Sequence, residues 1–182
     1  MKFYNILSIS ILILCFYCSG DDSPISTGRG YGDNVHYQIY SSVINDMFNS
    51  ELSHEITLCD STVYWKHFDN FNYISENIPG LLEETYNNYL QVNQESVQLL
   101  NIPDLNIQCN LISPNNISRW KEIYPNTNVL VHVSRIGYNT VGNQALLYIS
   151  EYSAPLAGAG YLVYLEKDSD WNVKQILMLW IS

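Results

Sequence analysis

Basic residues are scarce in this sequence. The 182-residue chain has 8 Lys and Arg against 18 Asp and Glu, which gives a net charge of −10. Proteins that bind the phosphate backbone of nucleic acids need clustered Lys and Arg, and no such cluster occurs here. The composition therefore argues against nucleic acid as a partner. Acidity by itself mainly indicates solubility, although it would also attract a basic partner.

Signatures of catalysis and of cofactor binding are missing as well. No G-x-S-x-G occurs, and none of the four histidines has the spacing of a zinc site: His36, His54, His67 and His132. The segment Ser118-Arg-Trp-Lys121 matches the S-x-x-K motif of penicillin-recognising enzymes, but the companion motifs S-D-N and K-T-G are absent. We therefore expect no catalytic residue, no metal site and no cofactor.

The apolar run at the N-terminus is too short to span a bilayer, which takes about 20 residues. It extends from Ile6 to Phe16, follows Lys2 and ends just before a polar stretch. This arrangement is typical of a signal segment. We predict a signal peptide over residues 1–17, a flexible tether rich in Gly, Ser and Asp over 18–32, and a single domain over 33–182.

The end of the apolar run carries a resemblance. Cys18-Ser-Gly-Asp-Asp follows it directly, and such a segment resembles the signal of a bacterial lipoprotein, with the acidic pair similar to the surface-export signal of Bacteroidetes lipoproteins. The resemblance implies lipidation of Cys18, export to the cell envelope, and attachment to the outer membrane through the lipid. Lipoprotein signals usually have a small residue before the cysteine, where this chain has Tyr17. Cys15 is the alternative, although no polar tether follows it directly.

Two further cysteines, Cys59 and Cys109, belong to the expected domain. In an oxidising compartment they could form a disulfide. They could equally be small buried thiols, since free Cys is among the most buried residue types. The sequence leaves both alternatives open.

Hydrophobic periodicity predicts helices in the first part of the domain and strands in the last part. We expect a helix from Asp33, whose apolar stripe includes Tyr40, Val43 and Ile44, a strand over Glu55–Tyr64 and then a loop through Ile78. Pro79-Gly80 opens a second helix, with an apolar side that continues to Leu100. The later elements are a short extended run around Ile107 and Leu111, a short helix from Ser113-Pro114 to Pro125, and four strands: from Asn128, Ala145–Tyr152, Gly160–Lys167 and Trp171–Ile181.

This order predicts an α+β domain in which N-terminal helices pack on a C-terminal four-stranded antiparallel sheet. The short connections between the last strands favour antiparallel pairing. Trp171–Ile181 is apolar on both faces toward its end, so we expect it to be an interior strand. The element order resembles the NTF2-like fold, with cystatin-like sheets as the alternative.

A second resemblance covers about a third of the chain. It includes Ser134-Arg-Ile-Gly137-Tyr-Asn139, Gln144-Ala-Leu-Leu-Tyr148 and Gly158-Ala-Gly160-Tyr161, framed by Trp120 and Trp180-Ile-Ser. These segments resemble a group of uncharacterised bacterial proteins, many with lipoprotein signals. The group prefers Phe where this chain has Tyr138. The resemblance implies no activity.

Aromatic residues are abundant, with 15 Tyr and 4 Trp. Aromatic side chains with polar tips serve protein interfaces and carbohydrate stacking, although core packing explains most of them. Two turns at strand ends could form a binding rim on one edge of the sheet: Tyr138, Asn139, Gly158, Gly160 and Tyr161. We expect a tethered, non-enzymatic module that binds a protein or a carbohydrate. The alternatives are an immunity-type inhibitor of a basic secreted toxin and a small hydrolase.

Overall fold

The computed structural model describes residues 34–48, 55–64, 70–100 and 102–182. The expected signal peptide, the tether and Cys18 lie outside the described residues. The elements are α1 (Asn34–Phe48), β1 (Glu55–Cys59), α2 (Phe71–Asn77), α3 (Glu83–Val92), β2 (Gln108–Ile112), the 3₁₀ helix η1 (Pro114–Arg119), α4 (Trp120–Ile123), β3 (Val129–Val133), β4 (Gly137–Tyr138), β5 (Gln144–Ala154), β6 (Ala157–Lys167) and β7 (Trp171–Ile181). The α+β class is confirmed.

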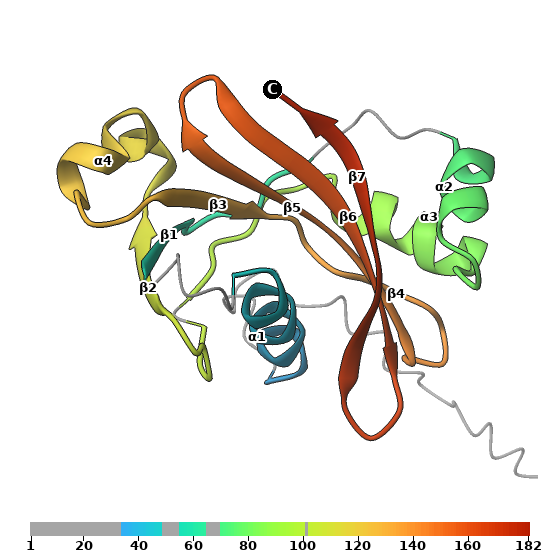
Figure 1. Ribbon diagram of the computed structural model, residues 1–182. Helices are drawn as coiled ribbons and strands as arrows, with labels where there is room; N and C mark the ends of the chain where they lie inside the picture. The colour runs from blue at the N-terminus through green and yellow to red at the C-terminus, as the bar shows by residue number, and fades with distance from the viewer. Residues whose placement is uncertain (1–33, 49–54, 65–69, 101) are drawn as a thin grey trace, which may run out of the picture.

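The sheet has seven strands instead of the expected four (Figure 1). The four predicted strands form β3, β5, β6 and β7, which pair antiparallel in that order. β4 pairs with β5, and β1 and β2 extend the other side of the sheet in the order β2-β1-β3. β1 is parallel to both β2 and β3. Parallel pairing needs long crossover connections, so local sequence patterns did not reveal that these strands join the same sheet.

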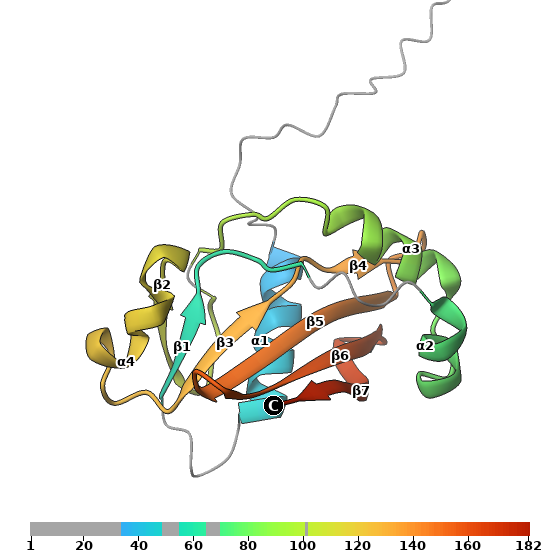
Figure 2. The ribbon, with the colours of Figure 1, turned by 90° about the horizontal axis from the view of Figure 1, so that it is seen from above.

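The sheet separates two layers of helices. Helix α1 packs on one face, where Tyr40, Val43 and Ile44 are fully buried among residues of β1, β3, β5 and β6. This confirms the apolar stripe expected of the first helix. The opposite face carries α2 and α3 at one end and η1 and α4 at the other, with the middle of the sheet between them (Figure 2). Side chains alternate along each strand, so every central strand contributes to both layers.

Strand β7 lies at the edge of the sheet, which corrects the expectation of an interior strand. Trp171 at its start is buried, but Met178 and Ile181 are 51% and 75% exposed. The apolar run of β7 arises because Ile176 packs against the core on the α1 side and Leu177 against the core on the opposite side. It does not mean that β7 has a neighbouring strand on both of its edges. Apolar patterns report burial of side chains and do not show which backbone groups are paired.

Helix α2 occupies a segment that the sequence indicated as a loop. Its seven residues include two Asn, which favour turns, but the side chain of Asn70 accepts hydrogen bonds from the amides of Asn72 and Tyr73 and begins the helix. Helix α3 in turn ends at Val92, before the expected limit at Leu100. The buried amide of Asn93 bonds the carbonyls of Tyr89 and Arg135, so a contact with the segment after β3 ends this helix.

Candidate functional site

The two turns expected to form one binding rim lie near opposite ends of β5. Tyr138 pairs with Ala145, whereas Gly158 pairs with Tyr152. Seven residues of extended strand separate these positions, which corresponds to about 23 Å. The two turns therefore do not share one edge of the sheet.

Tyr138 and Asn139 have evident structural roles. The Tyr138 hydroxyl lies 2.7 Å from Nδ1 of His36, and its ring meets Trp171 edge-on at 5.9 Å. The Asn139 side chain accepts hydrogen bonds from the amides of Asn143 and Gln144 and so closes the turn before β5. This end of the rim joins α1, β4 and β7.

Gly158 and Gly160 let aromatic side chains meet across β6. The Tyr152 ring lies over Gly158, and Trp180 lies over Gly160, where its Nε1 donates to the Tyr148 hydroxyl at 3.1 Å. The rings of Tyr152 and Trp180 are tilted by 42° to each other, with their centroids 5.7 Å apart. The glycines therefore form the floor of an aromatic cluster on the opposite face from α1.

Tyr161 is separate from that cluster. It packs against the core on the α1 side of the sheet, and its hydroxyl donates to Glu151 at 2.9 Å. Burial and the neighbouring carboxylate raise the pKa of Tyr161 to about 12. Tyr161 is thus a neutral hydrogen-bond donor at physiological pH.

The aromatic cluster borders a pocket of about 260 Å³ beneath η1 and α4. Its walls come from three separate parts of the chain: η1 and α4, β3, and the end of β5. The main lining residues are apolar or aromatic: Ile117, Trp120, Leu130, His132, Tyr152 and Pro155. A concave, mostly apolar pocket with few polar groups is the usual form of a ligand site.

The position of Trp120 explains how the pocket forms. Pro114 favours the first turn of η1, and Trp120 packs against Ile112 and Leu130 with only 6% of its surface exposed. The Tyr124 hydroxyl donates to the carbonyl of Leu111 at 2.9 Å, which fastens the helical segment to β2. Held in this way, the segment overhangs β3 and β5.

His132 contributes an imidazole to the pocket wall. Its ring lies 5.5 Å from that of Tyr152, and its Nε2 is buried without a hydrogen-bond partner among the described residues. Burial lowers the pKa of His132 from its ordinary value, so the imidazole is neutral at physiological pH. A neutral imidazole can donate and accept, but it carries no charge to attract a ligand.

The pocket lacks the geometry of a hydrolase in the part of the chain that the structure describes. Ser118 lines it, but no hydrogen bond joins Ser118 to His132, and no carboxylate is among the lining residues. No hydrogen bond joins Ser118 to Lys121 among the described residues, and the Nζ of Lys121 donates to the carbonyl of Ser153 at 2.6 Å and lies 5.0 Å from the centre of the Trp120 ring. The S-x-x-K spacing is therefore not accompanied by catalytic geometry.

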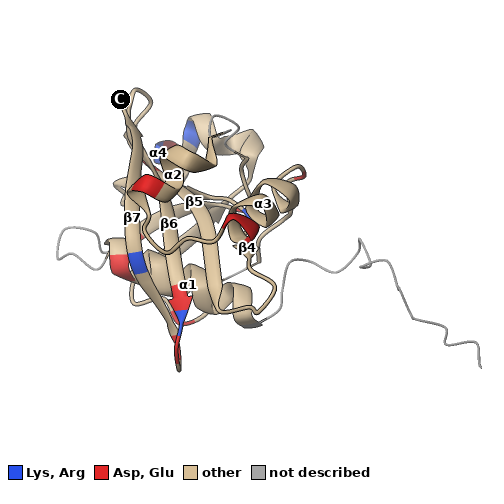
Figure 3. Cartoon of the chain, turned by 90° about the vertical axis from the view of Figure 1, so that its right-hand side faces the viewer, with Lys and Arg blue, Asp and Glu red and all other residues tan. Residues whose placement is uncertain are grey.

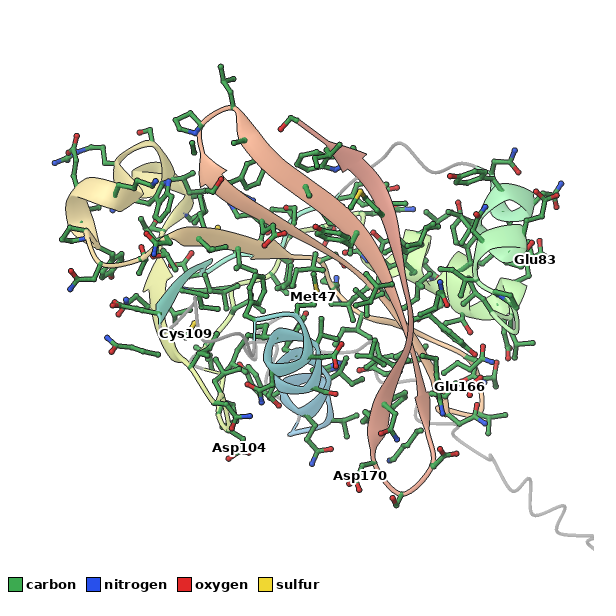
Figure 4. All side chains as sticks on the ribbon, viewed as in Figure 1. Met47, Glu83, Asp104, Cys109, Glu166 and Asp170 are labelled. Atoms are coloured by element: carbon green, nitrogen blue, oxygen red, sulfur yellow. The ribbon has the colours of Figure 1, made fainter. Side chains whose placement is uncertain are left out.

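A second, more polar pocket of about 280 Å³ lies between α1 and the β6–β7 hairpin. Asp170 lines it from the hairpin, which projects beyond the sheet, while Asp104 lies at a separate loop (Figure 4). Asn45 also lines this pocket, but its side chain already bonds the backbone of Asp104 and Asn106. The side chain of Asn45 thus serves the fold.

Cys59 and Cys109 are free thiols in the structure. Cys109 is opposite Ile56 in the β1–β2 register, three residues from Cys59, which is about 10 Å along a strand. Because side chains alternate, Cys59 also lies on the other face of the sheet from Ile56 and Cys109. A disulfide needs Cα atoms roughly 4.4–6.8 Å apart, so this register keeps the thiols separate.

Comparison with protein-family models, with curated proteins and with solved structures finds no match. Within the described ranges, no helix is long and apolar enough to cross a membrane. The same part of the chain contains no group of three or more His, Cys, Asp or Glu that could hold a metal ion. The arguments for function thus depend on the pocket and the surface.

Proposed function

We propose that this protein is an envelope lipoprotein, attached through Cys18 to the outer membrane and exposed at the surface, whose folded domain is a non-enzymatic binding module. The pocket beneath η1 and α4 is its ligand site. The observation that carries this proposal is the pocket wall, where the rings of Trp120, His132 and Tyr152 surround an apolar space. These residue types favour binding of a flat or apolar group presented by a protein, a carbohydrate or a small molecule.

The resemblance of the N-terminal segment to lipoprotein signals supports the anchor. Replacing Cys18 by Ser should release the protein from the membrane fraction, because one acyl-bearing cysteine would be lost. Cys15→Ser is the matched control and should leave the protein in that fraction. If Cys15→Ser releases the protein and Cys18→Ser does not, the anchor is Cys15.

The assignment of the pocket as the ligand site is tested by filling the pocket with a larger side chain. Ser118 is exposed at the pocket, so Ser118→Trp should block ligand entry without disturbing the core. Gln94→Trp places the same side chain at an exposed position outside the pocket lining and serves as the control. Glycans and small apolar molecules that raise the melting temperature should lose this effect only in Ser118→Trp. Ligands that bind both variants equally, or turnover abolished by one point mutation, would refute the proposal.

A second candidate, inhibition of a basic secreted protein, is favoured by the end of the molecule formed by α2, α3 and the β4–β5 turn. Tyr73, Leu82 and Val141 are exposed there. Glu83 and Glu84 lie in the first turn of α3, and residues 70–118 contain no Lys, Arg or His. Figure 3 shows no Lys or Arg on α2 and α3. A basic partner would find both charge complementarity and apolar contact.

The second candidate has a distinct test. Reversing Glu83 and Glu84 to Lys should weaken binding to a basic secreted protein encoded by a neighbouring gene, and added salt should weaken the wild-type complex. Ser118→Trp should leave such a complex intact. Loss of the complex in Ser118→Trp alone would instead assign the partner to the pocket.

A further inference from the structure

The chemistry around the pocket narrows the class of ligand it would accept. This step depends on the proposed function, since it assumes that the pocket beneath η1 and α4 binds something. Its lining is mostly apolar or aromatic, and its histidine, His132, is neutral. Selectivity for a charged group must therefore come from side chains at its border.

Lys121 lies at that border. Its Nζ donates to the carbonyl of Ser153, and the residues on both sides of Ser153, Tyr152 and Ala154, line the pocket. The same Nζ lies 5.0 Å from the centre of the ring of Trp120, which is also a lining residue. The ammonium thus lies beside lining residues of both α4 and β5, although Lys121 is not itself a lining residue.

The charge of Lys121 is available to a ligand. Its neighbour Arg119 is paired with Glu122 at 2.8 Å, whereas Lys121 forms no ion pair with any described carboxylate. An ammonium has three N–H donors, and the Ser153 carbonyl uses one of them. The remaining donors can bind an anionic group at the mouth of the pocket.

An anion alone would gain little from the apolar interior, and a cation would be repelled by Lys121. We propose that the pocket binds an amphipathic monocarboxylate, with the apolar body between the rings of Trp120 and Tyr152 and the carboxylate on Lys121. The body is short, because the pocket of about 260 Å³ is smaller than the roughly 300–1,000 Å³ of sites for drug-sized ligands. Lys121 is the specificity-determining residue.

The test uses matched acids and alcohols on the full-length protein. Phenylpropionate and octanoate are compared with phenylpropanol and octanol, which have the same bodies without the charge. Titration calorimetry gives the affinity, and the fluorescence of the four tryptophans, which include Trp120, gives a second signal of binding. We expect each acid to bind about three to ten times more tightly than its alcohol, because an exposed charge contact adds a modest amount to apolar burial.

Two charge-removing variants separate the role of Lys121 from a general effect of charge. Lys121→Gln should abolish the preference for the acids and leave the affinity for the alcohols unchanged. Arg119→Gln removes a cation from the same short helical segment. It should change neither the preference for the acids nor the affinity for the alcohols. Circular dichroism and the melting temperature establish that both variants are folded.

The outcomes distinguish this inference from the proposed function. If acids and alcohols bind equally, and Lys121→Gln changes nothing, the pocket is a binding site but the carboxylate assignment is wrong. A third outcome is that none of the four probes binds, while a glycan or peptide binds the wild-type protein and not Ser118→Trp. The carboxylate assignment is then also wrong, but the proposal of a binding module stands. Binding that persists in Ser118→Trp places the ligand elsewhere and overturns both.

Discussion

The indole of Trp180 covers the α-carbon of Gly160 so closely that residue 160 has no room for a side chain. A Cβ there would lie 2.1 Å from Nε1 of Trp180 and 2.7 Å from the hydroxyl of Tyr148. This contact lets aromatic side chains of β5 and β7 meet across β6. It also couples the edge strand to the aromatic cluster beside the pocket.

We expect Gly160→Ala to lower the free energy of unfolding by about 1–3 kcal/mol, because the added methyl group displaces the indole. The cost should be smaller when Trp180 is replaced by Ala, since the main obstacle is then absent. Urea unfolding of the two single variants and the double variant gives the coupling energy. Strictly additive costs would show that Trp180 does not restrict this position.

Gly137 has a tighter constraint, because its neighbour is backbone. A Cβ at residue 137 would lie 2.4 Å from the Cα and the amide nitrogen of Tyr89, in helix α3. A helix backbone cannot rotate away as a side chain can, so Gly137→Ala should destabilise the protein by about 3 kcal/mol and by more than Gly160→Ala. Urea unfolding of Gly137→Ala, alongside Gly160→Ala, measures this loss of stability. A cost below that of Gly160→Ala would contradict the close packing of α3 on β4.

His132 should make the protein less stable in mild acid. Its folded pKa is lowered by burial, so below the ordinary pKa of 6.5 the unfolded chain takes up a proton that the folded chain resists. Stability is therefore lost as the pH falls through 6.5 toward the folded pKa. His132→Leu should reduce the drop in melting temperature between about pH 7.5 and pH 5, a range that spans the ordinary pKa. An equal drop in both proteins would show that His132 titrates normally.

Cys59 and Cys109 should remain reduced in the folded protein. Burial raises the pKa of both thiols, that of Cys109 to about 11, so only about 0.1% of Cys109 is thiolate at pH 8. In a chain with Cys15→Ser and Cys18→Ser, a thiol reagent should react slowly before denaturation and with both cysteines after it. A thiol count of zero under denaturing, non-reducing conditions would reveal a disulfide.

Residue patterns predicted the elements that form through local interactions and short connections. Runs of strand-forming apolar residues and the turn residues Asp168-Ser-Asp170 specify β6 and β7, and the antiparallel order follows because the connecting turns are short. The stripe of Tyr40, Val43 and Ile44 specifies a helix with one buried face. Each of these signals lies within about 20 residues of chain, which is the range over which periodicity and turn chemistry act.

The sequence by itself determined the class of the domain, the first helix and the antiparallel strands. Tertiary structure alone decided that β1 joins the sheet between β2 and β3, that Asn93 ends α3 through a bond to Arg135, and which residues line the pocket. Trp120, His132 and Tyr152 belong to different elements, so no local spacing relates them. They meet because η1 and α4 are fastened over the sheet, and such long-range packing leaves no periodic signal in one sequence.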